Sequence, residues 1–146
     1  MYRKGLIVLC ILFAASAEAQ QKTAEELVAS KKKADITYRQ LMEIMGSASG
    51  LINEGIVREN PQMVRNGATL ILDHPAPNHK PWTIVAEPER AAFKQTLLTF
   101  DKIMDNQAEK AAQLAEKRDW SGAGKAAYEL TNSCISCHAA WKQKAR

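Results

Sequence analysis

Apolar residues recur at spacings of three and four along most of this chain, and no segment after residue 19 alternates as a strand does. Such spacing places side chains on one face of an α-helix, so four runs of this kind predict four amphipathic helices. The runs are Tyr38, Leu41, Met42, Met45, Ala48, Ile52 and Ile56; Val64, Ala68 and Ile71; Phe93, Leu97, Phe100, Met104, Ala108, Ala111 and Leu114; and Ala127, Leu130, Cys134, Cys137, His138 and Trp141.

Proline-containing breaks separate these runs. Asn60-Pro61 ends the first and opens the second, because proline is tolerated at a helix start. The segment DHPAPNHKPW at 73–82 has three prolines and is predicted to be a loop. Pro88 suits another first turn, and RDWSGAG at 118–124 separates the last two helices. Short connections favour an all-α, antiparallel up-down-up-down four-helix bundle.

Capping residues leave the start of the first helix open. Thr23 with Glu26 forms the pattern of a capping box, yet Asp35 is also a reasonable N-cap. The basic stretch between them would be a helical extension or an arm. For the last helix, Asp119 or Ser121 is a plausible N-cap.

Residues 1–19 have the layout of a secretory signal peptide. Arg3 and Lys4 precede an apolar stretch, and small residues follow it before Gln20. The alternative, an N-terminal membrane anchor, would need a longer apolar run. We therefore expect cleavage before Gln20, export to the periplasm, no stable membrane insertion, and one domain at 20–146.

The charge of the chain is mildly basic. Its formal net charge is +4, and loss of two basic residues and one acidic residue with the signal peptide leaves +3. Such a charge favours an acidic protein partner and gives little support for nucleic acid, which is not expected as a partner. No glycine-rich phosphate loop or nucleophile motif occurs, so no enzymatic activity or catalytic residue is expected.

Two cysteines and a histidine, Cys134, Cys137 and His138, stand within five residues near the C-terminus. A structural zinc site usually needs four ligands, and a second cysteine pair is absent. A thioredoxin-type centre needs its first cysteine at a helix N-terminus after a strand, whereas this pair lies inside a predicted helix. A disulfide within one helix would be strained and would close a loop too small to stabilise much.

Covalent haem attachment accounts for all three residues together. In a helix, Cys134 and Cys137 project from one face about a turn apart, where they can add to the two vinyl groups of a haem. His138 follows Cys134 by four residues, so its imidazole can bind the iron from the same face. The Cys-x-x-Cys-His pattern is typical of c-type attachment, which in bacteria takes place outside the cytoplasm. We therefore expect one haem c, bound through Cys134 and Cys137.

A four-helix chain with its haem motif near the C-terminus resembles the class II cytochromes c, the family of cytochrome c prime and its low-spin relatives. The resemblance covers about residues 35–145. Family members typically carry a Tyr-Arg-Gln-like segment and then a haem-facing residue on the first helix, similar to TYRQLM at 37–42 with glycines at 46 and 50. After the motif they usually have an aromatic residue and an arginine, where this chain has Trp141 and Lys142.

This resemblance implies roles for further residues. It makes Arg39 a candidate partner for a haem propionate, with Gln40 as a second candidate. It also implies that the chain could form a homodimer through its first two helices.

His74 and His79 could serve as alternative axial ligands or bind another metal. In a proline-rich loop, however, we expect them to be exposed bystanders.

The sixth iron ligand is predicted from helix geometry. In an antiparallel bundle, the start of the first helix lies beside the end of the fourth. If the first helix begins at Asp35, Met42 lies roughly 10 Å along its axis, a depth similar to that of His138 in the fourth helix. We expect haem between these helices, with His138 and Met42 as axial ligands. Met45, one turn further on, is the rival ligand.

Two functions follow from this prediction. With both axial positions filled, the chain would be a one-electron carrier for redox partner proteins of the respiratory chain, because His/Met ligation raises the reduction potential. With the sixth position open, it would instead bind small gases such as NO or CO, as five-coordinate cytochrome c prime does. One side chain, that of Met42, separates the two functions.

Overall fold

The computed structural model describes residues 23–145, so the predicted signal peptide at 1–19 lies outside the described residues. The described chain is almost entirely helical, which confirms the all-α prediction. Its α-helices are α1 (Ala24–Ser30), α2 (Tyr38–Val57), α3 (Pro61–Leu72), α4 (Arg90–Glu116) and α5 (Trp120–Trp141). Its shorter elements are the strands β1 (Lys33–Ala34) and β2 (Ala76–Pro77) and the 3-10 helices η1 (Pro81–Ile84) and η2 (Glu87–Glu89).

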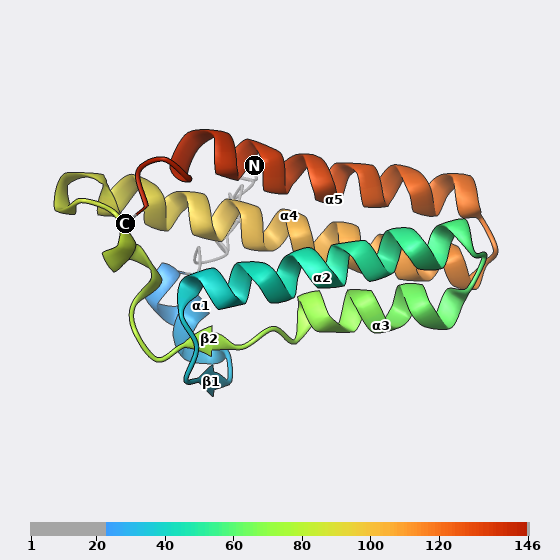
Figure 1. The fold of residues 1–146 in the computed structure, drawn as a ribbon, viewed down its shortest axis with the longest axis horizontal. Helices are drawn as coiled ribbons and strands as arrows, with labels where there is room; N and C mark the ends of the chain where they lie inside the picture. The colour runs from blue at the N-terminus through green and yellow to red at the C-terminus, as the bar shows by residue number, and fades with distance from the viewer. Residues whose placement is uncertain (1–22, 146) are drawn as a thin grey trace, which may run out of the picture.

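The four long helices form a helical bundle (Figure 1). Helix α2 packs against α3 and α5, and α4 packs against the same two helices. The α2–α3 and α4–α5 turns lie at one end of the bundle, and α1 packs on α4 towards the other end. Among residues 23–145, no helix combines the length and the apolar character needed to cross a bilayer.

The first long helix begins at neither of the two predicted N-caps, Thr23 and Asp35. Thr23 does form a capping box with Glu26, but that box starts the separate short helix α1. Helix α2 is capped by Thr37, whose hydroxyl accepts from the Gln40 backbone while the Gln40 side chain accepts from the Thr37 backbone. Asp35 is therefore wrong as the N-cap, because a reciprocal capping box two residues later satisfies two backbone donors.

Extended backbone between α1 and α2 explains why residues 23–145 contain five α-helices and not the four predicted. β1 pairs in parallel with β2 of the proline-rich segment, in the register Lys33 to Ala76 and Ala34 to Pro77. The Ala76 N–H donates to the Lys32 carbonyl at 2.9 Å. The predicted loop at 73–82 is thus free of α-helix, but it contains β2 and the start of η1.

Several other predicted helix boundaries are confirmed. Asn60 caps α3 and Pro61 occupies its first turn. Asp119, and not Ser121, caps α5 by accepting from the Gly122 N–H at 2.9 Å. Pro88 lies in η2, immediately before α4.

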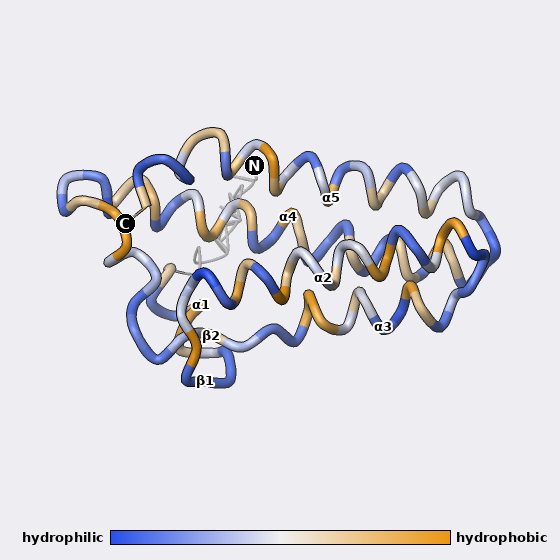
Figure 2. Tube along the Cα trace, viewed as in Figure 1, coloured by the Kyte–Doolittle hydropathy of each residue, from blue (hydrophilic) through white to orange (hydrophobic). Residues whose placement is uncertain are grey.

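The main core joins all four long helices and extends from the end that carries the two turns to the first turns of α2. Its alanines on α4 and α5 let these helices approach closely, because interaxial distance depends on the side chains at the contact. The buried members are Leu41, Met45, Ala48, Ile52, Val64, Ala68, Ile71, Ala108, Ala111, Ala115, Ala123, Ala126, Ala127 and Leu130. Figure 2 shows the corresponding alternation of apolar and polar residues along each helix.

A second cluster lies at the other end of the bundle. It is built on Phe93 near the start of α4, Trp82 of η1, Val85 and Ala24 of α1. This cluster fixes α1 and the segment after α3 against α4, beside the part of α5 that carries the two cysteines.

The α2–α3 contact depends on glycine. A Cβ added at Gly67 would lie 2.7 Å from the Ala48 carbonyl oxygen and 2.9 Å from the Ile52 backbone nitrogen. Backbone atoms of α2 cannot move away as a flexible side chain can. Gly67 of α3 therefore permits these two helices to touch. Gly55 of α2 does the same, since its added Cβ would lie 2.7 Å from the Val64 backbone nitrogen.

Gly67→Ala should lower the free energy of unfolding by about 1–3 kcal/mol, because the added methyl group overpacks the contact with α2. Gly50→Ala is the matched control in α2, since a Cβ there meets nothing within 4 Å. That variant should be more stable by about 0.5–1 kcal/mol through its gain in helix propensity. Urea unfolding of both variants checks the pair, and equal effects would contradict the close approach.

Candidate functional site

The last two turns of α5 bring the two thiols and the imidazole together. Because α5 is continuous from Trp120 to Trp141, Cys134, Cys137 and His138 lie on one helical face, three and four residues apart. Both cysteines are free thiols and half-buried, and His138 is more exposed. All three line the same cavity.

This first cavity has a volume of about 150 Å³ and lies between α1, α2, α4, α5 and the segment after α3. Its wall is mostly apolar. From α2 and α4 it is lined by Leu41, Met42, Met45, Gly46, Leu97, Phe100 and Met104. The structure therefore places the thioethers of α2 across one cavity from the thiols and the imidazole of α5.

A second cavity of about 530 Å³ adjoins the first. The two share Tyr38, Met42, Cys137 and His138 as lining residues. Met45 lines only the first cavity and is a buried member of the main core. Of the two predicted methionine ligands, Met42 is therefore the one that shares both cavities with His138.

Arg39 and Gln40 lie differently from each other. Arg39 lines the second cavity with Lys142, and its Nε donates to Glu43 at 3.2 Å in an exposed ion pair. Gln40 lines neither cavity, and its side chain is used in the N-terminal cap of α2. The structure thus brings Arg39 to the site but gives Gln40 a capping role.

An aromatic cluster holds the end of α5 in place. The Phe93 ring packs edge-on against Trp141 at 5.0 Å and against Tyr38 at 6.3 Å between ring centroids. The Trp141 indole also donates to the Thr96 hydroxyl at 3.1 Å. Because these contacts tie α5 to α2 and α4 one turn from His138, they fix the position of the motif.

Burial controls the ionisation of the groups beside this cluster. It raises the pKa of both Cys134 and Cys137, so neither thiol resembles an activated thiolate. Burial also raises the pKa of Tyr38, with smaller contributions from Cys137 and Asp101. Since a dithiol redox centre needs a lowered thiol pKa, these directions disfavour thioredoxin-type chemistry.

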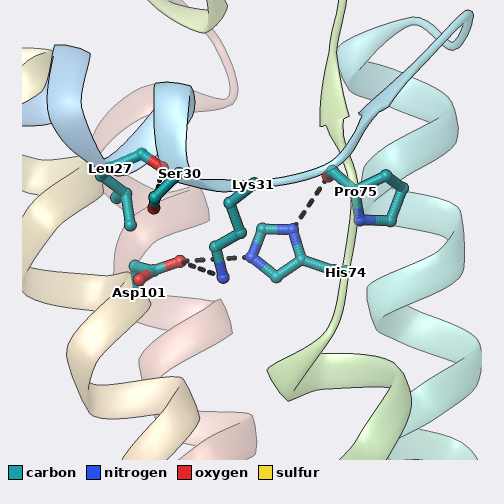
Figure 3. A network of polar contacts seen from close by, with 6 residues as sticks. All are labelled: Leu27, Ser30, Lys31, His74, Pro75 and Asp101. Carbon is teal, nitrogen blue, oxygen red and sulfur yellow. Dashed lines mark hydrogen bonds and ion pairs between the residues drawn. The ribbon is translucent and has the colours of Figure 1, made fainter.

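A polar network occupies another wall of the first cavity (Figure 3). His74 contacts Asp101 Oδ1 through Nε2 at 3.2 Å and the Pro75 carbonyl oxygen through Nδ1 at 3.0 Å. The Lys31 ammonium lies 3.4 Å from the same Asp101 oxygen. The side chains of Lys31, His74 and Asp101 are only 12%, 11% and 16% exposed.

The expectation that both loop histidines are exposed bystanders is wrong for His74. Its ring is drawn inward because Asp101 and Pro75 supply acceptors to both nitrogens. His79 is exposed and lines neither cavity.

Sequence reasoning missed Asp101 and Lys31 altogether. Asp101 carried a usable signal, because it stands four residues after Leu97 and three before Met104, within an otherwise apolar run. A carboxylate on the inward face of a helix needs a partner. Lys31 carried no such signal, since it belongs to a run of three lysines.

The ionisation of Asp101 is set by opposing effects. Burial alone would raise its pKa, but the hydrogen bond from His74 and the charge of Lys31 outweigh it and hold the pKa below its ordinary value. The pKa of the neighbouring Asp105 is raised by burial and then by the charge of Asp101. As pH rises, Asp101 therefore loses its proton before Asp105 does.

No group of three or more His, Cys, Asp and Glu side chains placed to hold a metal ion occurs among residues 23–145. Comparison with known proteins adds no relative, since no family model, no curated protein and no solved structure matches the chain.

Asp101→Asn should lower stability near pH 7 by about 1–3 kcal/mol, because it removes charge-assisted bonds from a half-buried site. A lowered carboxyl pKa stabilises the fold above the ordinary value of 3.8 and loses that effect as pH falls through the folded value. The difference from the wild type should therefore shrink as pH falls below 3.8 and through the lowered pKa of Asp101. Urea unfolding of the wild type and the variant from pH 7 downwards measures this difference, and Asp35→Asn, at an exposed position, is the control. A difference that does not change with pH would contradict the ion pairing of Asp101.

Proposed function

We propose that this chain is an exported c-type monohaem cytochrome that carries one electron at a time between redox partner proteins. The observation that carries the proposal is the convergence of Cys134, Cys137, His138 and Met42 on one mostly apolar cavity. Two thiols, an imidazole and a thioether are the groups that c-type attachment and His/Met ligation require. The proposal includes haem c as cofactor and the periplasm as location.

The residues at the site fit such a group. The His138 imidazole makes no hydrogen bond or ion pair with any other residue of the described part, so both of its nitrogens remain available. An added Cβ at Gly46, which lines the first cavity, would meet no atom within 4 Å. The adjoining second cavity provides further room beside Met42 and His138. A flat cofactor bound by Met42 and His138 would need open space between these two side chains.

When bound, haem c would supply a one-electron redox centre, held by thioether bonds to Cys134 and Cys137 and by axial ligation from His138 and Met42. The chain contributes the fixed positions of these groups. The aromatic contacts of Trp141 with Phe93 and Thr96 hold the end of α5. The capping box at Thr37 fixes the first turn of α2, one turn before Met42.

The proposed haem lies between α2 and α5 in an antiparallel up-down-up-down bundle. Support comes from the short α2–α3 and α4–α5 turns, which lie at the same end in Figure 1. From that end, α2 and α5 separate towards the end where the cavities lie.

A redox partner could approach the outer face of α5. Ile135, between the two cysteines, is 60% exposed, and Ala139 beside His138 is also exposed. The motif therefore lies within one helix diameter of the surface, and the net positive charge favours an acidic partner. Partners in the respiratory chain and a homodimer through α2 and α3 belong to the proposal on the family resemblance alone.

Met42→Ala tests the function most sharply. In the oxidised wild type, we expect low-spin iron with a Met–iron charge-transfer band in absorption and electron paramagnetic resonance spectra. Met42→Ala should lose the band and become high-spin, because no thioether remains in the shared wall of the two cavities. The reduced variant should then bind carbon monoxide promptly.

Met45→Ala is the matched control, one turn away on the same helix. It should stay low-spin, although it should lose about 2–5 kcal/mol of stability because Met45 is buried in the core. Retention of the band in Met42→Ala, with its loss in Met45→Ala, would transfer the ligand role to Met45. A high-spin wild type that binds carbon monoxide would replace the carrier by the gas-binding alternative.

A further inference from the structure

We propose that His74, Asp101 and Lys31 form a proton-binding site whose occupancy is coupled to the redox state of the proposed haem. All three side chains line the first cavity together with Met42 and His138. They come from three separate parts of the chain, namely the end of α1, the start of the segment after α3, and α4. The inference rests on the proposed function, since it needs a redox centre in this cavity.

The hydrogen bonds of His74 define where the proton sits. The Pro75 carbonyl can only accept, so Nδ1 must donate to it across 3.0 Å. An ionised Asp101 can also only accept, so Nε2 must donate to it across 3.2 Å. Only the doubly protonated imidazolium satisfies both contacts. Loss of the Nε2 proton to solvent leaves the nitrogen lone pair facing the ionised carboxylate of Asp101.

The surrounding charges keep the pair able to gain or lose a proton. The Lys31 ammonium, at 3.4 Å from Asp101, holds the carboxylate ionised and opposes a second positive charge on His74. On α4, Asp105 faces the same group, and Asp73 lies at the end of α3. On α2, the hydroxyl of Tyr38 is electrostatically coupled to Asp101, and burial keeps it protonated.

The coupling between the charge of the redox centre and the proton affinity of the His74–Asp101 pair follows from Coulomb's law. One electron entering the cavity removes one unit of positive charge, so the proton affinity of the His74–Asp101 pair rises. At a separation on the order of 10 Å and an effective dielectric constant of about 20, the change is roughly tenfold. In balance, the oxidised protein takes one electron from its redox partner, and the His74–Asp101 pair gains at most about half a proton from solvent, which is what a tenfold change in proton affinity moves. Reoxidation releases both.

The test is the reduction potential of the haem-loaded protein, measured by spectroelectrochemistry from about pH 5 to about pH 9, where histidine titrates. The wild-type potential should fall as pH rises, by about 59 mV in total, which is the tenfold coupling converted for a one-electron couple. His74→Gln should flatten the slope within this range. His79→Gln is the matched control in the same loop, and it should keep the wild-type slope because His79 is exposed and lines neither cavity.

A second readout does not depend on electron-transfer activity. Nuclear magnetic resonance titration of the His74 ring should give a midpoint about one pH unit higher in the reduced than in the oxidised protein, as the tenfold coupling requires. Equal midpoints, or a slope in His74→Gln equal to that of the wild type, would overturn the inference. If the same protein still shows a reversible one-electron couple, the carrier proposal stands. Absence of any reversible one-electron couple would overturn both.

Discussion

Side-chain size changes along the inner face of α4, and the cavity depends on that change. The face begins with Phe93, Leu97, Phe100 and Met104 and ends with Ala108, Ala111 and Ala115. Alanine allows α4 and α5 to pack closely at the end with the turns, whereas large side chains hold neighbouring helices apart at the other end. Both cavities lie where the large side chains are. The bundle thus leaves room beside Cys134, Cys137 and His138 without a break in any long helix.

Different walls of this space carry different chemical groups. Helix α5 contributes the thiols and the imidazole, α2 contributes Met42, and the aromatic cluster around Phe93 fixes the two helices relative to each other. A separate wall holds the polar network of His74, Asp101 and Lys31. A mostly apolar chamber with a single polar corner strengthens any charge interaction inside it, because the local dielectric constant is low. This arrangement links the proposed electron carrier to the proposed proton site.

Local patterns predicted most of the fold. The spacing of apolar residues predicted the four long helices, and Asn60-Pro61 and Asp119 marked helix starts, because amphipathicity and capping act within a few residues. Thr37 was overlooked in favour of Asp35, although Gln40 three residues later completes its capping box. The α2 and α4 ends were harder to predict. There Glu59 and Arg118 adopt positive φ angles of 51° and 59°, positions at which glycine would be the usual signal.

Long-range contacts account for what the sequence could not predict at the site. Cys134, Cys137, His138 and Met42 were identified from helical spacing, and the structure brings all four to one cavity. The inward position of His74 depends on Asp101, which is 27 residues away. The β1–β2 pairing that carries Lys31 towards the cavity likewise joins segments distant in sequence. Two-residue strands leave no periodic pattern, so their pairing is decided by tertiary structure alone.

Covalent haem attachment is the central claim, and intact mass spectrometry tests it most directly. The chain should be exported from a bacterial host that contains the haem-maturation machinery, and then denatured before measurement so that only covalent groups remain. The account predicts the mass of the mature polypeptide plus one haem, and the mass of the polypeptide alone for the Cys134→Ala/Cys137→Ala variant. A wild-type mass equal to that of the polypeptide, or smaller by the two hydrogens of a Cys134–Cys137 disulfide, would contradict the account.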